Sequence, residues 1–397
     1  MIVVRKKFLK LCLLVYSVYF FTLSVKNTLL PVYIANDFTG LIDFLRSYTA
    51  SVIIHSAAPW QLYDPDVFYK LLSGFSAHPI DKNLPYAWYY SPAYSLLIEF
   101  LSAFSLKSSF VLWVVFQFSL LALAGYRFLW FRLCDAVIFL TPTAFIAAID
   151  WGQNGVLIAA FYIAAFRFMK TRPLLSGCFF ACAIFKPQLG LLLPLLLLPG
   201  KYYKIICSAI VAGFFIILAS VYFYGIASWL AYYNSFKDGF SFHHAEGFAN
   251  AMHGIMDFTH ILYMPTLDNV FYTVGVPDTL SKILKVACYG YFAWRAFSIT
   301  STTKEPPEIM AQFALLALLI FPYAGIYDYV FAVSATLGLL LAVRDFETID
   351  IGGAIIVLVL PIIFVIHIIV AKQTGIVFVP LLIWATYEYV RISSVAK

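Results

Sequence analysis

The sequence is poor in charge. Aspartate, glutamate, lysine and arginine make up 12% of its 397 residues, whereas 63% are hydrophobic and the mean hydropathy is +0.89. A soluble domain carries about 25% charged and 45–50% apolar residues, so this composition indicates an integral membrane protein. The 26 lysines and arginines are scattered among short connections, which argues against a nucleic-acid partner and is typical of residues that orient helices in a lipid bilayer.

Cysteine is also scarce. The six cysteines lie in or beside apolar segments, and none belongs to a CxxC motif or to a Cys/His cluster with metal-ligand spacing. We therefore expect neither a disulfide framework nor a metal site. Cys178 and Cys182, one helical turn apart, are interpreted as small buried hydrophobic residues.

Apolar runs follow one another along most of the chain. At about 20 residues for a full span, they predict an all-α integral membrane protein, a polytopic bundle of roughly ten to thirteen helical segments in one domain, residues 1–397. The first run, residues 8–30, follows Arg5-Lys6-Lys7, so we expect an uncleaved helix with a cytoplasmic N-terminus. The predicted location is the inner (plasma) membrane, with several crossings.

Two apolar runs are too short to span. Residues 173–185 and 187–200 flank Lys186-Pro187-Gln188, and we expect them to be half-length or broken helices. Non-helical backbone at membrane depth is tolerated where it is buried or lines a water-filled cavity. The break therefore predicts a polar cavity near Lys186.

Two polar stretches are predicted outside the membrane. Residues 31–90 form a first extracytoplasmic loop with an interfacial helix expected at 38–55, and residues 237–278 form an outer loop within the C-terminal helices, 231–397. The conspicuous polar side chains fall on this same face: Asp37, Tyr63-Asp64, Tyr89-Tyr90, Gln153-Asn154, Lys186, the His/Glu cluster at 243–246, and Asp328. This distribution predicts an extracytoplasmic active site.

Asp37 stands where the chain leaves the first apolar run. Its carboxylate is a candidate catalytic base, and the structural alternative is an N-cap of the interfacial helix, a role that aspartate often takes. Asp43 follows six residues later, so the two carboxylates would not share a helical face. The spacing does not argue for a carboxylate pair.

Lys186 needs an anionic partner between its short helices, and a phosphate would supply one. Tyr327-Asp328 begins a late apolar run, where helix capping is the alternative to ligand binding. The cluster His243-His244-x-Glu246 is not an HExxH motif and could be a polar loop, a substrate contact or a metal site.

The order of these features resembles glycosyltransferase family 87, a family of multi-spanning GT-C enzymes that includes alpha-mannosyltransferases. The residues that carry the resemblance are Asp37-Phe38, Tyr48, Ala58-Pro59-Trp60-Gln61-Leu62-Tyr63-Asp64, Tyr90-Ser91-Pro92, Gly152-Gln153-Asn154, Ser176-Gly177, Lys186-Pro187 and Tyr327-Asp328. The match covers about residues 31 to 200, and residues 1–230 are expected to form the GT-C-like module. The sequence departs from the family in having no glycine in the Ala57-Ala58-Pro59 turn, and the histidine-rich loop does not align.

The resemblance implies inverting transfer of mannose or another hexose from a polyprenyl-phosphate-sugar to a lipid or glycan acceptor. Asp37 would be the catalytic base. Substrate contacts are expected at Tyr48, Tyr63, Tyr90, Gln153, Asn154, Lys186, Gln188, His244, His253, Tyr327 and Asp328. A phosphate leaving group needs no protonation, so one base suffices, and neither a metal nor another cofactor is expected.

Two other functions stay open. A transporter or flippase would bind its cargo in the polar cavity without transforming it, but no internal repeat is evident. A polysaccharide polymerase or ligase would use diphosphate-linked donors and usually an arginine-rich outer loop. Arg46 is the only arginine in residues 31–90, and residues 237–278 contain none.

Overall fold

The protein is described by a computed structural model that covers residues 3–35, 37–38, 41–76, 88–130, 132, 143–244, 270–271, 275–320, 328–343, 348–362 and 375–395. Helices dominate these residues, as an all-α membrane protein requires. The α-helices are α1 (Lys6–Ser24), α2 (Ile42–Ile54), α3 (Pro65–Phe75), α4 (Pro92–Ile98), α5 (Leu106–Gly125), α7 (Thr143–Trp151), α8 (Gly155–Phe168), α9 (Pro173–Ala181), α10 (Pro187–Gly190), α11 (Leu193–Leu197), α12 (Tyr203–His244), α15 (Asp278–Thr302), α16 (Pro306–Ile320), α17 (Tyr329–Gly338), α18 (Ile351–Val359) and α20 (Gly375–Val395).

Shorter helical pieces extend or connect these helices. The π-helical turns are η1 (Val25–Leu29), η2 (Pro31–Ala35) and η9 (Leu339–Val343). The 3-10 turns are η4 (Pro59–Tyr63), η5 (Glu99–Ala103), η6 (Cys182–Phe185) and η10 (Leu360–Ile362).

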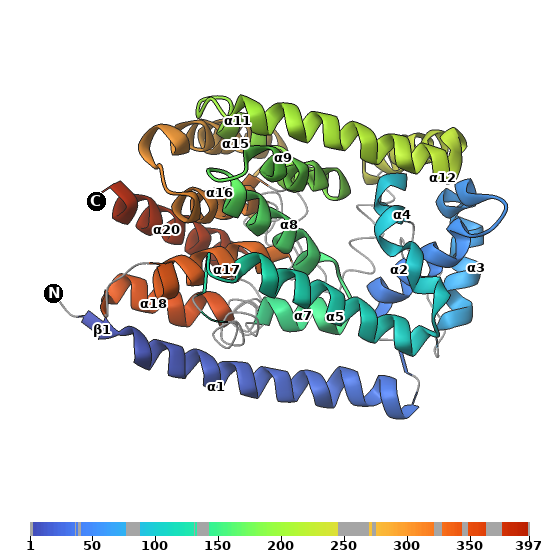
Figure 1. Ribbon diagram of the computed structural model, residues 1–397, viewed down its shortest axis with the longest axis horizontal. Coiled ribbons are helices and arrows are strands. Elements are labelled where there is room, and N and C mark those ends of the chain that lie inside the picture. Colours follow the sequence, from blue (N-terminus) through green and yellow to red (C-terminus); the bar gives the residue numbers. More distant parts are fainter. Residues whose placement is uncertain are drawn as a thin grey trace.

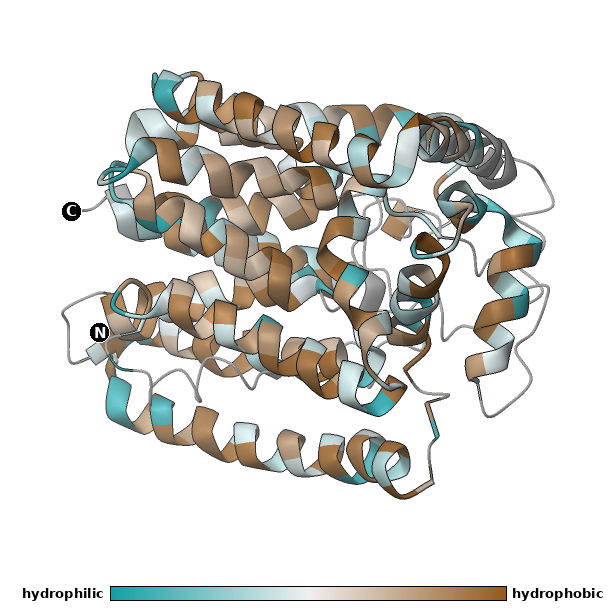
Figure 2. Ribbon diagram, turned by 45° about the vertical axis from the view of Figure 1, so that its right-hand side comes forward, coloured by the Kyte–Doolittle hydropathy of each residue, from teal (hydrophilic) through white to brown (hydrophobic). Residues whose placement is uncertain are grey.

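Three helices in the described part of the chain are long and apolar enough to cross a membrane: Lys6–Ala35, Leu106–Gly125 and Tyr203–Ser235. Most residues in the apolar windows of these helices are not covered by protein, as lipid-facing helices require. In Tyr203–Ser235 only 11% of that window is buried. In Figure 1, α1 and α12 lie on opposite sides of the bundle. Figure 2 shows hydrophobic residues along these helices and hydrophilic residues toward their ends.

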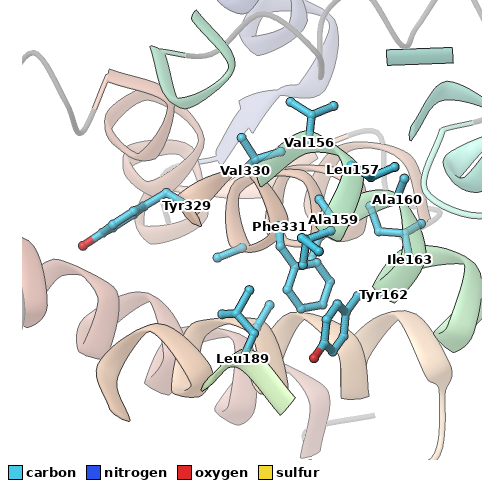
Figure 3. Close-up of a cluster of buried hydrophobic side chains, with 14 of the residues drawn as sticks. Val156, Leu157, Ala159, Ala160, Tyr162, Ile163, Leu189, Tyr329, Val330 and Phe331 are labelled. Atoms are coloured by element: carbon cyan, nitrogen blue, oxygen red, sulfur yellow. The ribbon is translucent and has the colours of Figure 1, made fainter. Parts of the chain in front are cut away.

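Shorter helices fill the centre of the bundle. Nearly every residue of α8, α16 and α17 is buried. A helix that is apolar all round is stable only when surrounded, and these three are surrounded by other helices rather than by lipid. Figure 3 shows α8 side chains such as Val156 and Leu157 packed near Val330 and Phe331 of α17 and Leu189 of α10.

The broken helices expected on either side of Lys186 are confirmed. Residues 173–185 form α9 followed by the 3-10 turn η6, and residues 187–200 contain only the short helices α10 and α11. Proline explains part of this pattern, because it begins α9 and α10 and because the residue before a proline is driven out of the helical conformation. Lys186 accordingly has φ −146° and ψ 72°.

α2 begins later than expected and packs against other helices. We expected an interfacial helix over residues 38–55; α2 begins at Ile42, and most of its residues are buried against α3, α4, η4 and η5. Its aromatic and small residues, including Phe44, Tyr48 and Ala50, are covered by protein on several sides. α2 is therefore part of the packed structure, at the end of the molecule opposite both termini (Figure 1).

Other boundaries also differ from the sequence-based expectation. α12 continues to His244, so the outer loop expected from residue 237 begins as helix, with a break at Gly225 where φ is +75°. A two-stranded antiparallel ribbon, β1 (Val3–Arg5) with β2 (Thr348–Asp350), was not expected from the apolar periodicity.

Candidate active site

A buried ion pair joins the helix break to the start of α17. The Lys186 ammonium donates to the Asp328 carboxylate, and the two side chains are 6% and 1% exposed. Asp328 occupies the N-cap position of α17, but its side chain makes no capping hydrogen bond. The capping interpretation of Asp328 is therefore wrong, and the anion beside Lys186 is a carboxylate of the protein itself.

A tight turn at Gly152 fixes α2 against the start of α8. Gly152 has φ +67°, and a Cβ atom at this position would lie 2.2 Å from the Cβ of Phe44. The Gly152 carbonyl accepts a hydrogen bond from the Trp113 indole at 3.1 Å. Only glycine allows both the left-handed conformation and this approach. As a result, the first turn of α2, with Asp43, is held next to the 152–154 turn.

The phenol of Tyr90 connects the outer loop to that turn. Tyr90 donates a hydrogen bond to Oε1 of Gln153 at 3.4 Å. Its ring stacks on Tyr94, with centroids 4.3 Å apart, and Trp88 packs 5.1 Å from the Tyr90 ring. Because Pro92 starts α4 directly afterwards, Tyr90 lies at the helix entrance with its ring in the interior.

Charged groups surround Tyr90. Burial raises the pKa of the Tyr90 phenol well above its ordinary value, and the carboxylates of Asp43 and Asp328 raise this pKa further, whereas the Arg46 guanidinium lowers it. Tyr90 therefore lies within electrostatic reach of α2 and of the start of α17. The candidate active site consists of the side chains around it: Asp43, Arg46, Tyr90, Gln153, Asn154, Lys186 and Asp328.

Asp43 and Arg46 form the second ion pair of this site. They are i,i+3 neighbours on α2, with Nη1 of Arg46 3.2 Å from Oδ1 of Asp43 and side chains about one-fifth exposed. The guanidinium also lies 5.5 Å from the ring centroid of Tyr89. Asp43 is in the first turn of α2, where the helix dipole favours a negative charge. The pair thus offers a carboxylate that is less deeply buried than that of Asp328.

Asn154 supplies an unused amide to the site. The residue is 2% exposed, and neither Nδ2 nor Oδ1 has a hydrogen-bond partner among the described residues. Burial raises the pKa of the Tyr90 and Tyr94 phenols, and the nearby Asn154 side chain offsets a small part of that rise. A buried amide without partners costs free energy, which makes Asn154 a candidate for ligand binding.

Tyr63 attaches η4 to the same site. Its phenol donates a hydrogen bond to the carbonyl of Tyr90 at 2.9 Å, and its ring centroid lies 5.5 Å from that of Tyr232 on α12. Burial raises the pKa of Tyr63 well above its ordinary value, with a smaller contribution from Tyr232. The part of α12 beyond the Gly225 break thus contacts the site through Tyr63.

Asp37 lies in the connection between η2 and α2. The N-cap position of α2 is Leu41, so the N-cap interpretation of Asp37 is wrong. The Asp37 amide donates to the Pro31 carbonyl at 3.2 Å, and its side chain is partly exposed. The next residue, Phe38, lines an open pocket of about 380 Å³ together with Gly74, Phe75, Ser105, Leu106 and Lys107.

Some expected site residues have other surroundings. The Tyr48 phenol donates to the Phe104 carbonyl at 3.1 Å, which ties α2 to the end of η5. Asp64, part of the motif with Tyr63, caps α3 by accepting from the amides of Asp66 and Val67. Four further predictions lie outside the described residues, namely the side chains of Gln188 and His244, and His253 and Tyr327 entirely.

The sequence reasoning assigned no role to Asp43 or Arg46. A signal was present: the two residues have opposite charges and i,i+3 spacing, which brings side chains together on a helix. Arg46 is also the one arginine of the outer loop. Both were passed over because the carboxylate nearer the first helix, Asp37, was favoured.

Comparison with known proteins gives one match. The sequence model of glycosyltransferase family 87 matches residues 88–322, which is more than half of the chain. No curated protein and no solved structure matches the chain. The matched region contains Tyr90, Gln153, Asn154 and Lys186, whereas Asp43 precedes it and Asp328 follows it.

Proposed function

The chain belongs to glycosyltransferase family 87, and from this premise we propose that it transfers mannose or another hexose from a polyprenyl-phosphate-linked donor to a lipid or glycan acceptor. The proposed reaction takes place at the extracytoplasmic face of the inner (plasma) membrane. It is an inverting displacement in which the acceptor oxygen bonds to the anomeric carbon, the bond to the phosphate oxygen breaks, and the acceptor proton goes to a carboxylate. Atoms and charge balance without a further reactant.

The observation that carries this proposal is that residues of two ion pairs act on one tyrosine, Tyr90. Asp43 and Arg46 come from α2, and Lys186 and Asp328 come from the helix break and α17. The charges of Asp43, Arg46 and Asp328 influence the Tyr90 phenol, which also contacts the neutral amide of Gln153. A displacement needs a base at the attacking oxygen and a cation at the departing phosphate on the other side of the sugar. The carboxylate paired with Arg46 and the cation paired with Asp328 can supply these two groups.

The base is proposed to be a carboxylate of the outer loop. The sequence favours Asp37, directly after the first helix. The geometry favours Asp43, because the Gly152 contact with Phe44 holds the start of α2 against the 152–154 turn and because Asp43 lies within electrostatic reach of Tyr90. We therefore assign Asp43 as the base and keep Asp37 as the competing assignment.

Lys186 is proposed to stabilise the phosphate that leaves. In the absence of a donor, Asp328 neutralises the ammonium, which lets a cation persist at a buried position. A phosphate group that approaches Lys186 would share or replace this carboxylate. Charge that develops on the leaving oxygen is then stabilised by a fixed cation in surroundings with little water.

Transfer of radiolabel tests the proposal. The full chain is reconstituted in vesicles with polyprenyl-phosphate-linked [³H]mannose, glucose or galactose and an extract of membrane lipids as acceptors. We expect label in a new glycolipid or glycan with inverted anomeric configuration. Movement of intact donor between leaflets without a new glycosidic bond would instead favour a transporter, and transfer only from diphosphate-linked donors would favour a polymerase or ligase.

A further inference from the structure

The polar groups next to Tyr90 include several that have no partner. Besides the two amide atoms of Asn154, the indole nitrogen of Trp88 and the hydroxyl of Ser91 are buried without a hydrogen bond among the described residues. Trp88 packs against both Tyr90 and Tyr94, whose phenols face Asn154. The unused groups therefore border one aromatic cluster, formed by Trp88, Tyr90 and Tyr94.

The chemistry of these groups distinguishes between possible ligands. Oδ1 of Asn154 only accepts hydrogen bonds and Nδ2 only donates them, while the Trp88 nitrogen only donates. The oxygens of a phosphodiester monoanion only accept, so a phosphate at Asn154 would leave Oδ1 unpaired beside negative charge. A sugar hydroxyl both donates and accepts. Two neighbouring hydroxyls can satisfy both ends of one amide.

We propose that the Asn154 carboxamide binds two neighbouring hydroxyl groups of the transferred sugar, with Oδ1 accepting from one and Nδ2 donating to the other. This inference rests on the proposed function and assigns the sugar part of the donor to the neighbourhood of the aromatic cluster of Trp88, Tyr90 and Tyr94. Gln153 is occupied by the Tyr90 phenol at 3.4 Å. In this arrangement Gln153 orients the Tyr90 ring beside the sugar, and Asn154 is the amide that hydrogen-bonds to the sugar hydroxyls.

Binding of deoxy donors tests this assignment. The dissociation constant of the full chain in detergent is measured for polyprenyl-phosphate-mannose, for the glucose and galactose donors, and for monodeoxy analogues of the tightest binder. We expect removal of either contacted hydroxyl to weaken binding to the wild-type chain about ten- to a hundredfold, because a buried polar group is then left unpaired. Asn154→Ala should bind the parent donor less tightly by a similar factor. Its affinity for the two deoxy analogues should then be little lower than its affinity for the parent donor.

A matched control separates binding from folding. Gln117 is also a buried amide, but its Oε1 accepts from the backbone amide of Leu157 at 3.1 Å. Gln117→Ala should weaken the structure yet keep the wild-type discrimination among deoxy donors.

The outcomes of this experiment are distinct. If the losses from Asn154→Ala and from every deoxy analogue simply multiply, Asn154 does not contact the sugar hydroxyls and the inference is overturned, whether or not sugar transfer occurs. If the chain binds donors with the expected coupling but forms no glycosidic bond, the inference stands and the proposed transfer fails. No binding of any of the three parent donors overturns both.

Discussion

Lys186 and Asp328 lie 142 residues apart in the sequence and form an ion pair inside the protein. The pair joins the interruption between η6 and α10 to the first residue of the α17 segment. The desolvation penalty of burying two charges offsets much of their Coulombic attraction, so a buried ion pair is weak evidence of stabilisation. The Asp328 carboxylate also influences the Tyr90 phenol electrostatically, so the pair belongs to the candidate active site.

The first prediction concerns the two halves of this pair. Lys186→Met and Asp328→Asn should each lower the free energy of unfolding by about 3–5 kcal/mol, because each leaves one buried charge without its partner. Lys186→Met combined with Asp328→Leu should recover much of that loss. Thermal unfolding of the three variants in the same detergent measures these effects.

Sugar transfer by the double variant separates structure from catalysis. If Lys186 stabilises the leaving phosphate, the double variant should be folded and stable but inactive. Wild-type turnover in that variant would show that the ion pair contributes to packing and not to catalysis. The exposed pair of Lys170 and Glu305, 3.0 Å apart, offers a control, because removing it should change unfolding by no more than about 1 kcal/mol.

A second prediction distinguishes the two candidate bases. Asp43→Asn should reduce turnover by at least about a hundredfold, the usual contribution of general base catalysis, with little change in donor binding. Asp37→Asn should retain most of its activity, because it is the first turn of α2, with Asp43, and not the connection with Asp37 that the Gly152–Phe44 contact holds against the 152–154 turn. Turnover and the dissociation constant of the donor are measured for both variants. The opposite ranking of the two variants would return the role of base to Asp37.

Much of the architecture could be predicted from the sequence. Apolar runs identified the helices, and the prolines at 173 and 187 marked the broken segments, because these are local properties of the chain. The ion pair of Lys186 with Asp328 could not be predicted, since it depends on how α17 packs against α8 and α16. Our proposal of Asp43 rather than Asp37 as the base has the same origin: only the contact of Phe44 with Gly152 indicates which carboxylate is held next to the 152–154 turn.

Gly152 gives a third prediction. Gly152→Ala should destabilise the protein by at least about 1–2 kcal/mol from the left-handed conformation alone, and the new methyl group would overlap Phe44. Displacement of α2 would move Asp43, so turnover should fall more than stability explains. Gly213→Ala in α12 is the control, because a Cβ there meets nothing within 4 Å and alanine favours helix. Equal unfolding temperatures and turnover in the two variants would contradict the docking role of Gly152.

The last prediction follows from the buried phenols. Burial raises the pKa of Tyr63 and Tyr90 above the ordinary tyrosine value of about 10. Above pH 10 the unfolded chain releases these protons while the folded chain keeps them, so the free energy of unfolding falls as pH rises, by up to about 1.4 kcal/mol per pH unit for each such group. Below pH 9 both phenols are protonated in either state and contribute no pH dependence.

Tyrosine-to-phenylalanine variants measure this effect. Unfolding temperatures recorded from pH 7 to pH 11 should decline less steeply above pH 10 in Tyr90→Phe and Tyr63→Phe than in the wild-type chain, whereas Tyr33→Phe, at an exposed site, should follow the wild type. Because Tyr90 stays protonated throughout the working range, Tyr90→Phe should leave the shape of the pH profile of sugar transfer between pH 6 and pH 9 unchanged. Loss of a titration step that the wild-type chain shows in that range would indicate that the phenol itself exchanges a proton during the reaction, and the assignment of a carboxylate as sole base would then be wrong.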